Sequence, residues 1–180
     1  MMDENKHSYA GESMRRVEDE EMITGAGCYT DDLRFPEMTH LHFVRSPYPH
    51  AKIKKMDLSA AMESEGVLAV YTADDLIRDG VNPYPIPGPP GDFVTQEILD
   101  QGYRNGNGEP MDPPRWLALA KDEVRYVGQP VVAILAESAE NALTASEFVE
   151  VDYEELASVG TIQDAEIESA PAIWKGAPGN

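Results

Sequence analysis

The chain has 180 residues, which is enough to bury the core of one ordinary domain without disulfides or metal ions. Its net charge of −19, from 33 acidic and 14 basic side chains, repels phosphate, so neither nucleic acid nor an anionic membrane is expected as a partner. The single cysteine, Cys28, excludes an internal disulfide, and no apolar stretch approaches the roughly 18 residues of a membrane span. With no apolar signal segment near the N-terminus, these features predict a soluble, cytoplasmic protein.

The N-terminal residues 1–15 are polar and show no apolar period, which predicts a flexible tail. Folded structure is expected from residue 16 onward. Gly25 and Gly27 have the spacing of a phosphate-binding glycine turn, but the third glycine and the Lys-Ser/Thr pair of such turns are missing. A turn that needs a positive φ angle is therefore the better interpretation.

Residues 39–46 alternate polar and apolar side chains and are predicted to form a strand. His40 and His42 then lie on one face, because successive strand residues point to opposite sides. Two histidines at this spacing can bind a metal ion, but no third ligand has a diagnostic spacing. A polar strand face is the preferred interpretation.

Two more short strands are predicted, and each leads into a short helix. The first covers residues 52–57, where Asp57 can cap the helix that follows. The second covers residues 67–71. Thr72 and Asp75 then have the spacing of a capping box, which opens a helix of one or two turns.

Residues 81–114 are rich in proline and glycine and form a long loop by composition, with one short helix predicted at 95–99. A loop of this length inside a domain is usually a lid, a docking arm or a mobile segment. Limited proteolysis is expected to cut first within Gly102–Gly108, since nicking concentrates at loop tips.

The most apolar stretch of the chain is 131–136, which is predicted to be a strand buried on both faces. Ser138 can cap the helix that follows. The inward face of this helix is predicted to carry Ala142, Leu143, Ser146 and Val149. A returning strand within 148–153 is expected to complete one compact unit with the buried strand and its helix.

Three blocks in one order point to a family. They are Thr24-Gly-x-Gly-x-Tyr-x-Asp-Asp32, then Arg45-Ser-Pro-Tyr-Pro-His50 with Gly66-Val-Leu-Ala-Val-Tyr71, then Arg125-Tyr-Val-Gly-Gln-Pro130 with the apolar strand after it. Together they resemble the N-terminal α/β-hammerhead domain of the molybdenum hydroxylase large subunit. Its relatives are xanthine dehydrogenase, aldehyde oxidoreductase and aerobic carbon monoxide dehydrogenase.

The resemblance implies an α+β fold, the α/β-hammerhead, with a curved mixed sheet and a few packed helices. The hammerhead domain is expected over residues 16–175, with the tail 1–15 before it, the loop 81–114 inside it and a short C-terminal end at 176–180. The implied enzyme hydroxylates purines or aldehydes, or oxidises carbon monoxide, with water as the source of oxygen.

The resemblance also implies where the cofactors are. Molybdopterin with its molybdenum, the iron–sulfur clusters and FAD are expected in partner domains or subunits and not in this chain. No residue here matches a catalytic position of the family, so no catalytic, cofactor-binding or metal-binding residue is assigned. The chain is therefore expected to be a split subunit or a truncated product that is inactive alone.

The expected partners are the molybdopterin-binding subunit or domain and the iron–sulfur and FAD subunits of the same complex. The predicted contact residues are Arg45, Tyr48, His50 and Trp174, since aromatic and arginine side chains dominate interfaces. The role would be subunit assembly and shaping of the substrate channel. In one alternative, these side chains fill the domain's own core or sit singly on its surface. In another, the chain is a free-standing module that binds a small ligand with loop 81–114.

Overall fold

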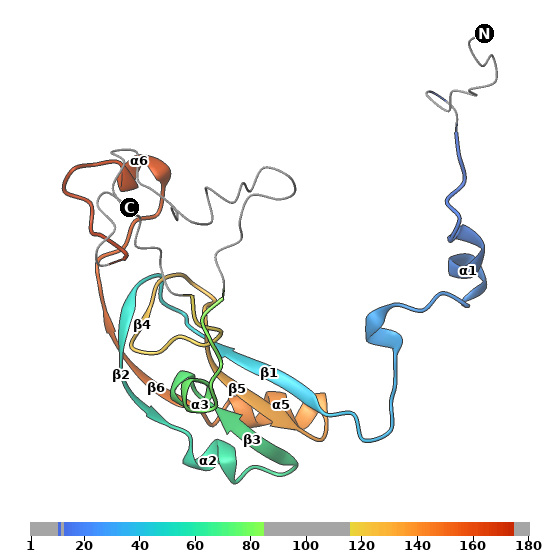
Figure 1. The fold of residues 1–180 in the computed structure, drawn as a ribbon, viewed down its shortest axis with the longest axis horizontal. Helices are drawn as coiled ribbons and strands as arrows, with labels where there is room; N and C mark the ends of the chain where they lie inside the picture. Colours follow the sequence, from blue (N-terminus) through green and yellow to red (C-terminus); the bar gives the residue numbers. More distant parts are fainter. Residues whose placement is uncertain (1–10, 12, 85–115, 175–180) are drawn as a thin grey trace. The chain divides into compact units, whose positions relative to one another are not determined.

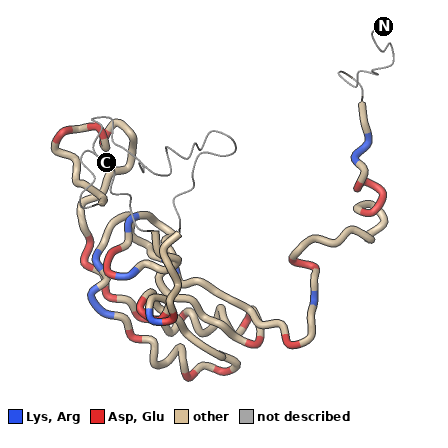
Figure 2. The backbone as a smooth tube through the Cα atoms, in the orientation of Figure 1, with Lys and Arg blue, Asp and Glu red and all other residues tan. Residues whose placement is uncertain are grey.

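The structure is a computed structural model that describes residues 11, 13–84 and 116–174. It divides the chain into two compact units, one that ends at Met38 and one that begins at Thr39. This boundary lies later than the domain start at residue 16 that the sequence suggested. Acidic side chains outnumber basic ones in the described chain (Figure 2).

The first unit contains α1 (Asp19–Thr24) and the 3₁₀ helix η1 (Thr30–Asp32). Gly25 ends α1 with a φ of 75°, and its amide donates back to the last turn of the helix. The left-handed conformation is one that glycine adopts at little cost. The expected positive-φ turn at Gly25 is thus confirmed.

In the described part of the second unit, six strands alternate between two three-stranded sheets (Figure 1). The first sheet has the order β1 (His40–Arg45), β5 (Pro130–Ala136), β3 (Val67–Tyr71). The second has the order β4 (Glu123–Val124), β2 (Ala51–Asp57), β6 (Glu150–Glu155). Odd-numbered strands therefore belong to one sheet and even-numbered strands to the other.

The α+β class is confirmed, but the expectation of one mixed sheet is wrong. All four pairings in the two sheets are antiparallel. β1 and β3 run in the same direction, yet β5 lies between them and runs the opposite way. β4 and β6 are separated by β2 in the same manner. Strands of equal direction are present in each sheet, but they are never neighbours.

The central strand was predicted correctly. β5 lies in the middle of its sheet, and Val131, Val132 and Ile134 have no exposed surface. Ile134 belongs to the main core, which also contains residues of the second sheet and of α5. Its neighbour Ala133 points to a smaller core with Ala73 and Leu119 on the other face. The strand is buried on both faces because a core lies against each of them.

The helix α5 (Ala139–Ser146) begins where it was predicted, and the Ser138 hydroxyl accepts a hydrogen bond from the Asn141 amide at 3.1 Å. Its inward face differs from the prediction. Ala142 and Ala145 are buried, whereas Leu143 is 54% exposed. Small side chains let α5 lie close to the sheet, and a leucine in their place would hold it away. β6 then pairs with β2 of the other sheet and does not return beside β5.

Two helices follow β2 and β3. Before α2 (Ser59–Met62), the Asp57 carboxylate accepts hydrogen bonds from the amide and hydroxyl of Ser59, at 3.1 and 2.6 Å. Before α3 (Ala73–Arg78), Thr72 and Asp75 form the predicted capping box. The last helix is α6 (Ile162–Ala165). Of loop 81–114, the structure describes only residues 81–84, so the predicted helix at 95–99 and the cleavage region lie outside the described residues.

Candidate functional site

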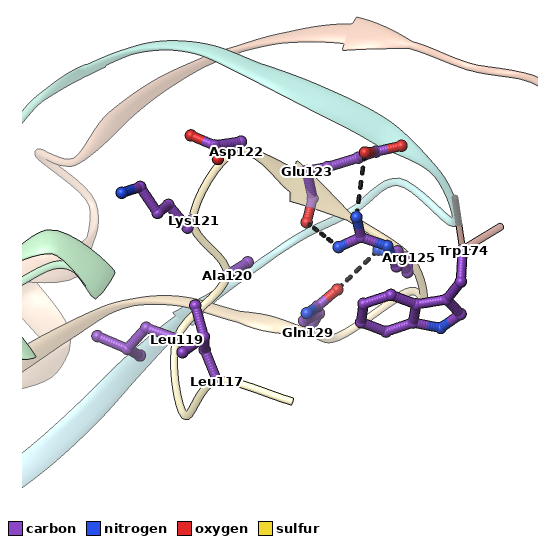
Figure 3. A pocket seen from close by; sticks show the side chains of 9 residues that line it. All are labelled: Leu117, Leu119, Ala120, Lys121, Asp122, Glu123, Arg125, Gln129 and Trp174. Carbon is purple, nitrogen blue, oxygen red and sulfur yellow. Dashed lines mark hydrogen bonds and ion pairs between the residues drawn. The ribbon is translucent and has the colours of Figure 1, made fainter. Parts of the chain in front are cut away.

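The side chain of Arg125 lies over the indole ring of Trp174, with its Cζ atom 4.0 Å from the ring centre (Figure 3). Its Nε donates to the carbonyl of Ile173 at 3.1 Å, and Nη1 donates to the carbonyl of Glu123 at 3.1 Å. A guanidinium stacked on an indole gains both a cation–π attraction and apolar contact. Arg125 thereby fixes the C-terminal Trp174 against the strand β4.

A chain of partly buried polar contacts continues from Arg125. Its Nη2 donates to Glu123 Oε2 at 3.1 Å, and Glu123 Oε1 lies 2.7 Å from Nε2 of His50. The other ring nitrogen of His50 donates to the carbonyl of Ala157 at 2.6 Å. His50 is 5% exposed, so both of its polar atoms need partners inside the protein. We call His50, Glu123 and Arg125 the charged clip.

The charged clip joins parts of the chain that are far apart in sequence. Side-chain exposures are 6% for His50, 13% for Glu123 and 20% for Arg125. A carboxylate withdrawn from water this far is stable only when positive groups and hydrogen bonds replace its hydration, and here Arg125 donates to one oxygen and a ring nitrogen of His50 lies 2.7 Å from the other. The clip holds the segment after β6 at two points, Ala157 and Ile173.

Three aromatic rings lie next to the clip. The ring centres of Trp116 and Trp174 are 5.6 Å apart, and those of Trp116 and Tyr126 are 6.3 Å apart. These tilted contacts are favourable ring geometries. Trp116 is 44% exposed and Tyr126 is 43% exposed, although both are large and partly apolar. We call these three residues the aromatic surface.

The turn between β4 and β5 carries one ring of this surface and is itself tightly held. Gly128 has a φ of 87°, and the Gln129 side-chain oxygen accepts a hydrogen bond from the Arg125 amide at 2.7 Å. Gln129 is 8% exposed. The buried side chain of Gln129 thus closes the turn that presents Tyr126.

The structure brings two of the four predicted contact residues to this region. Arg45 donates from Nη1 to the carbonyl of Gly128 at 2.9 Å, so it adjoins the same turn, and Trp174 belongs to the aromatic surface. Tyr48 is half-buried and stacks on Tyr153 at 5.2 Å between ring centres. Burial raises the pKa of the Tyr153 hydroxyl. His50 lies inside the domain as part of the charged clip.

Sequence reasoning missed Glu123, Arg125 and Tyr126 as members of this site. For Glu123 and Arg125, the local sequence pattern could have indicated that they belong together. They flank Val124, which is completely buried, so both charged side chains point to the side of β4 opposite to Val124. Tyr126 gave no signal of its own, because only the fold places it beside Trp116.

A shallow hollow of about 190 Å³ adjoins the clip (Figure 3). Leu117 and Leu119 supply apolar lining, and Lys121, Gln129 and Trp174 supply polar atoms and a ring. Lys121 forms an ion pair with Asp74 at 2.9 Å, and this hydrogen bond raises the Lys121 pKa. The hollow has room for about one ring-sized side chain. It can accept an inserted side chain from a partner.

No group of three or more His, Cys, Asp and Glu side chains within the described ranges is arranged to hold a metal ion. No described helix has the length and apolar character needed to cross a membrane. Cys28 is exposed.

Comparison with known proteins identifies the family of this fold. The model of the "aldehyde oxidase and xanthine dehydrogenase, a/b hammerhead domain" family matches residues 24–102 and 91–157. The chain belongs to this hammerhead family. The resemblance drawn from the three sequence blocks and the hammerhead architecture are both confirmed.

Three similar proteins show how far the likeness extends. The nicotine 6-hydroxylase large subunit of Paenarthrobacter nicotinovorans is 34% identical over 161 residues, which cover 85% of this chain and 17% of that protein. The aldehyde oxidoreductase structure from Desulfovibrio gigas superposes with a TM-score of 0.69 at 30% identity, over 91% of this chain and 16% of that one. A Cu,Mo-CO dehydrogenase structure gives a TM-score of 0.64 at 32% identity, over 89% and 17%. The hammerhead chain thus spans about one sixth of the length of each of these three proteins.

Proposed function

We propose that this hammerhead chain is a non-catalytic part of a molybdenum hydroxylase, which docks on the molybdopterin-binding domain or subunit through the aromatic surface. One observation carries the proposal. Trp116, Tyr126 and Trp174 form a contiguous set of rings that stays partly exposed, and Arg125 of the charged clip stacks on one of them, Trp174. Exposed aromatic clusters of this kind are typical of protein interfaces.

The charges beside the rings support the same role. Arg45 lies next to the turn of Tyr126, and Arg125 stacks on Trp174. Arginine and tryptophan are the residues that contribute most to binding energy at interface centres. The rigid clip lowers the cost of binding, because rings that are already fixed lose little freedom when a partner covers them. The proposed contact also includes Tyr48, which was among the predicted contact residues. His50, another of them, belongs to the charged clip and supports the rings from inside the domain.

The cofactors belong to the partners in this proposal. The resemblance implies molybdopterin, iron–sulfur clusters and FAD, and one of the similar structures is a Cu,Mo-CO dehydrogenase. Cys28 alone cannot supply the four ligands of an iron–sulfur cluster. The chain would contribute to assembly and to the wall of the substrate channel, and the reaction would take place on the partner.

Sedimentation velocity with the molybdopterin-binding chain of the same organism tests the proposal. A complex is expected at micromolar concentration. Trp116→Ala and Trp174→Ala should each weaken binding by about tenfold or more, as truncation of central interface tryptophans does. Phe35→Ala is the matched control, because Phe35 is 64% exposed but lies in the first compact unit.

Two results would contradict the proposal. The chains could stay apart at micromolar concentration with cofactor present, or both tryptophan variants could bind as tightly as the parent. Thermal melting of each variant should accompany the binding measurement, since Trp174 also contacts the charged clip. Within the described ranges, Trp116 forms ring contacts with Trp174 and Tyr126 but no hydrogen bond with the clip, so Trp116→Ala separates loss of contact from loss of folding.

A further inference from the structure

A second surface, with no residue in common with the aromatic surface, lies between α2 and α5. The two helices contact each other, and a groove of about 430 Å³ runs between them. Ala60 and Thr144 are among its small lining residues, and Phe148 stands at its α5 end. Phe148 is 49% exposed although it is a large apolar side chain.

The groove is built on a rigid base. Gly66 follows α2 with a φ of 71°, and a Cβ atom there would collide with the side chain of Asn141 on α5. The Gly66 carbonyl accepts a hydrogen bond from the Glu137 amide at 2.8 Å. Ala61 and Ala142, both buried, let the helices approach closely. The shape of the groove is therefore fixed before anything binds.

Three glutamates line the groove: Glu63, Glu65 and Glu140. All three are exposed, and none forms an ion pair among the described residues. The sequence places no lysine or arginine within 56–77 or 126–174, the two stretches that supply the groove. Figure 2 shows acidic positions and no basic ones along α2, β3 and α5. Within the described ranges, no basic side chain is paired with these glutamates.

We propose that this groove docks a basic, amphipathic segment of a partner protein. An apolar side chain of the segment would pack on Phe148 between the helices, and its lysines or arginines would face the three glutamates. Helical segments with apolar anchors commonly bind in grooves of this kind. Charge complementarity selects the occupant, because a neutral apolar segment would leave the glutamates unpaired and an acidic one would be repelled.

Fluorescence anisotropy of a labelled synthetic peptide tests this inference. The probe has leucine and lysine at helical spacing, and its counterpart has glutamate at each lysine position. The lysine peptide should bind the 180-residue chain, and the glutamate peptide should not. Raising the salt from about 0.05 to about 0.5 M should weaken the binding, since exposed charges are screened over shorter distances.

Charge-matched variants locate the site. Glu63→Gln/Glu65→Gln/Glu140→Gln should weaken binding of the lysine peptide by about tenfold, the combined effect of three exposed ion pairs. Glu18→Gln/Glu20→Gln/Glu21→Gln removes the same charge from α1 and its N-cap and should change the affinity by less than about twofold, because these glutamates lie outside the groove.

A second pair of variants tests the apolar contact. Phe148→Ala should weaken binding of the lysine peptide. Leu143→Ala should leave the binding unchanged, because Leu143 is about as exposed as Phe148 but does not line the groove.

Other outcomes would overturn the inference. Equal weakening by both triple variants would mean that only the net charge attracts the peptide. Retained binding in the groove variant, or binding of the glutamate peptide, would place the contact elsewhere. A groove variant that abolishes self-association of the chain without affecting peptide binding would identify a second copy as the occupant. If Phe148→Ala fails to fold, the two triple variants still decide, because they alter exposed side chains only.

Discussion

Ile134 is the residue on which the core depends most directly. It has no exposed surface and belongs to the main core between the two sheets and α5. Ile134→Val should lower the free energy of unfolding by about 0.5–1.5 kcal/mol, as loss of one buried methylene does. Ile134→Asp should prevent folding, because a carboxylate there has no partner and no water. Circular dichroism with urea titration measures both effects.

Leu143→Asp is the control at this scale. Leu143 is 54% exposed, so a carboxylate there should change stability by no more than about 0.5 kcal/mol, as surface substitutions usually do. Equal melting of the Ile134→Asp variant and the parent would mean that β5 is not the centre of the core.

Single residues also show how much of the structure can be predicted from local sequence patterns. Ile134 was predictable because six apolar residues in a row have few interpretations. His50 was expected at a contact because aromatic and arginine side chains dominate interfaces, and the structure places it inside the domain, 5% exposed. Its partner Ala157 lies 107 positions away and Glu123 lies 73 positions away. No local pattern indicates such partners, so the charged clip could not be predicted from sequence.

The capping box of α3 makes a prediction about the dependence of stability on pH. Asp75 Oδ2 accepts hydrogen bonds from the amide and hydroxyl of Thr72, at 2.8 and 2.7 Å. These hydrogen bonds, chiefly the one from the hydroxyl, lower the pKa of Asp75 in the folded protein. Folding is therefore favoured while Asp75 is ionised, and its contribution is lost as the pH falls through the folded-state pKa.

Asp75→Asn should therefore cost about 1 kcal/mol of stability at pH 7, the usual size of a lost helix cap. The difference from the parent should shrink as the pH drops below the ordinary aspartate pKa of about 3.9, because the parent's carboxylate is then neutral as well. Urea unfolding at a series of pH values checks this. Asp122→Asn, at an exposed position whose side chain forms no hydrogen bond or ion pair within the described chain, should leave stability unchanged at every pH. A constant gap between Asp75→Asn and the parent would contradict the assignment.

Elements whose signals are local were predicted well. The caps at Ser138 and at Thr72 with Asp75 use residues at most three positions apart, and their hydrogen bonds form as expected. The partners of the strands were not predicted. A returning strand was expected after α5 without a named partner, and β6 pairs with β2, whose residues lie about a hundred positions earlier. Pairing over such distances is decided by which apolar faces the whole fold brings together.

At the scale of the whole molecule, the alternation of strands makes the two sheets interdependent. Among the strands that the structure describes, each one belongs to the other sheet than the strand before it. Residues of both sheets also share the main core. The second unit should therefore unfold in one transition, without a state in which one sheet survives.

Native-state hydrogen exchange tests this coupling. Ile134 is a residue of the first sheet, and Ile134→Val should lower the exchange protection of slow amides in β2 as much as that of amides in β5. Equal protection of β2 in the variant and the parent would show that the second sheet opens independently.

The pairing order has a consequence for the growing chain during synthesis. β5 takes part in both pairings of the first sheet, and each pairing of the second sheet needs β4 or β6. No pairing within either sheet can form before residue 123 has been made, and the first sheet must wait for residue 130. Until then β1, β2 and β3 leave the ribosome without their strand partners. Their apolar faces are then open to chaperones, or to other nascent chains, for most of the time that the ribosome needs to make the domain.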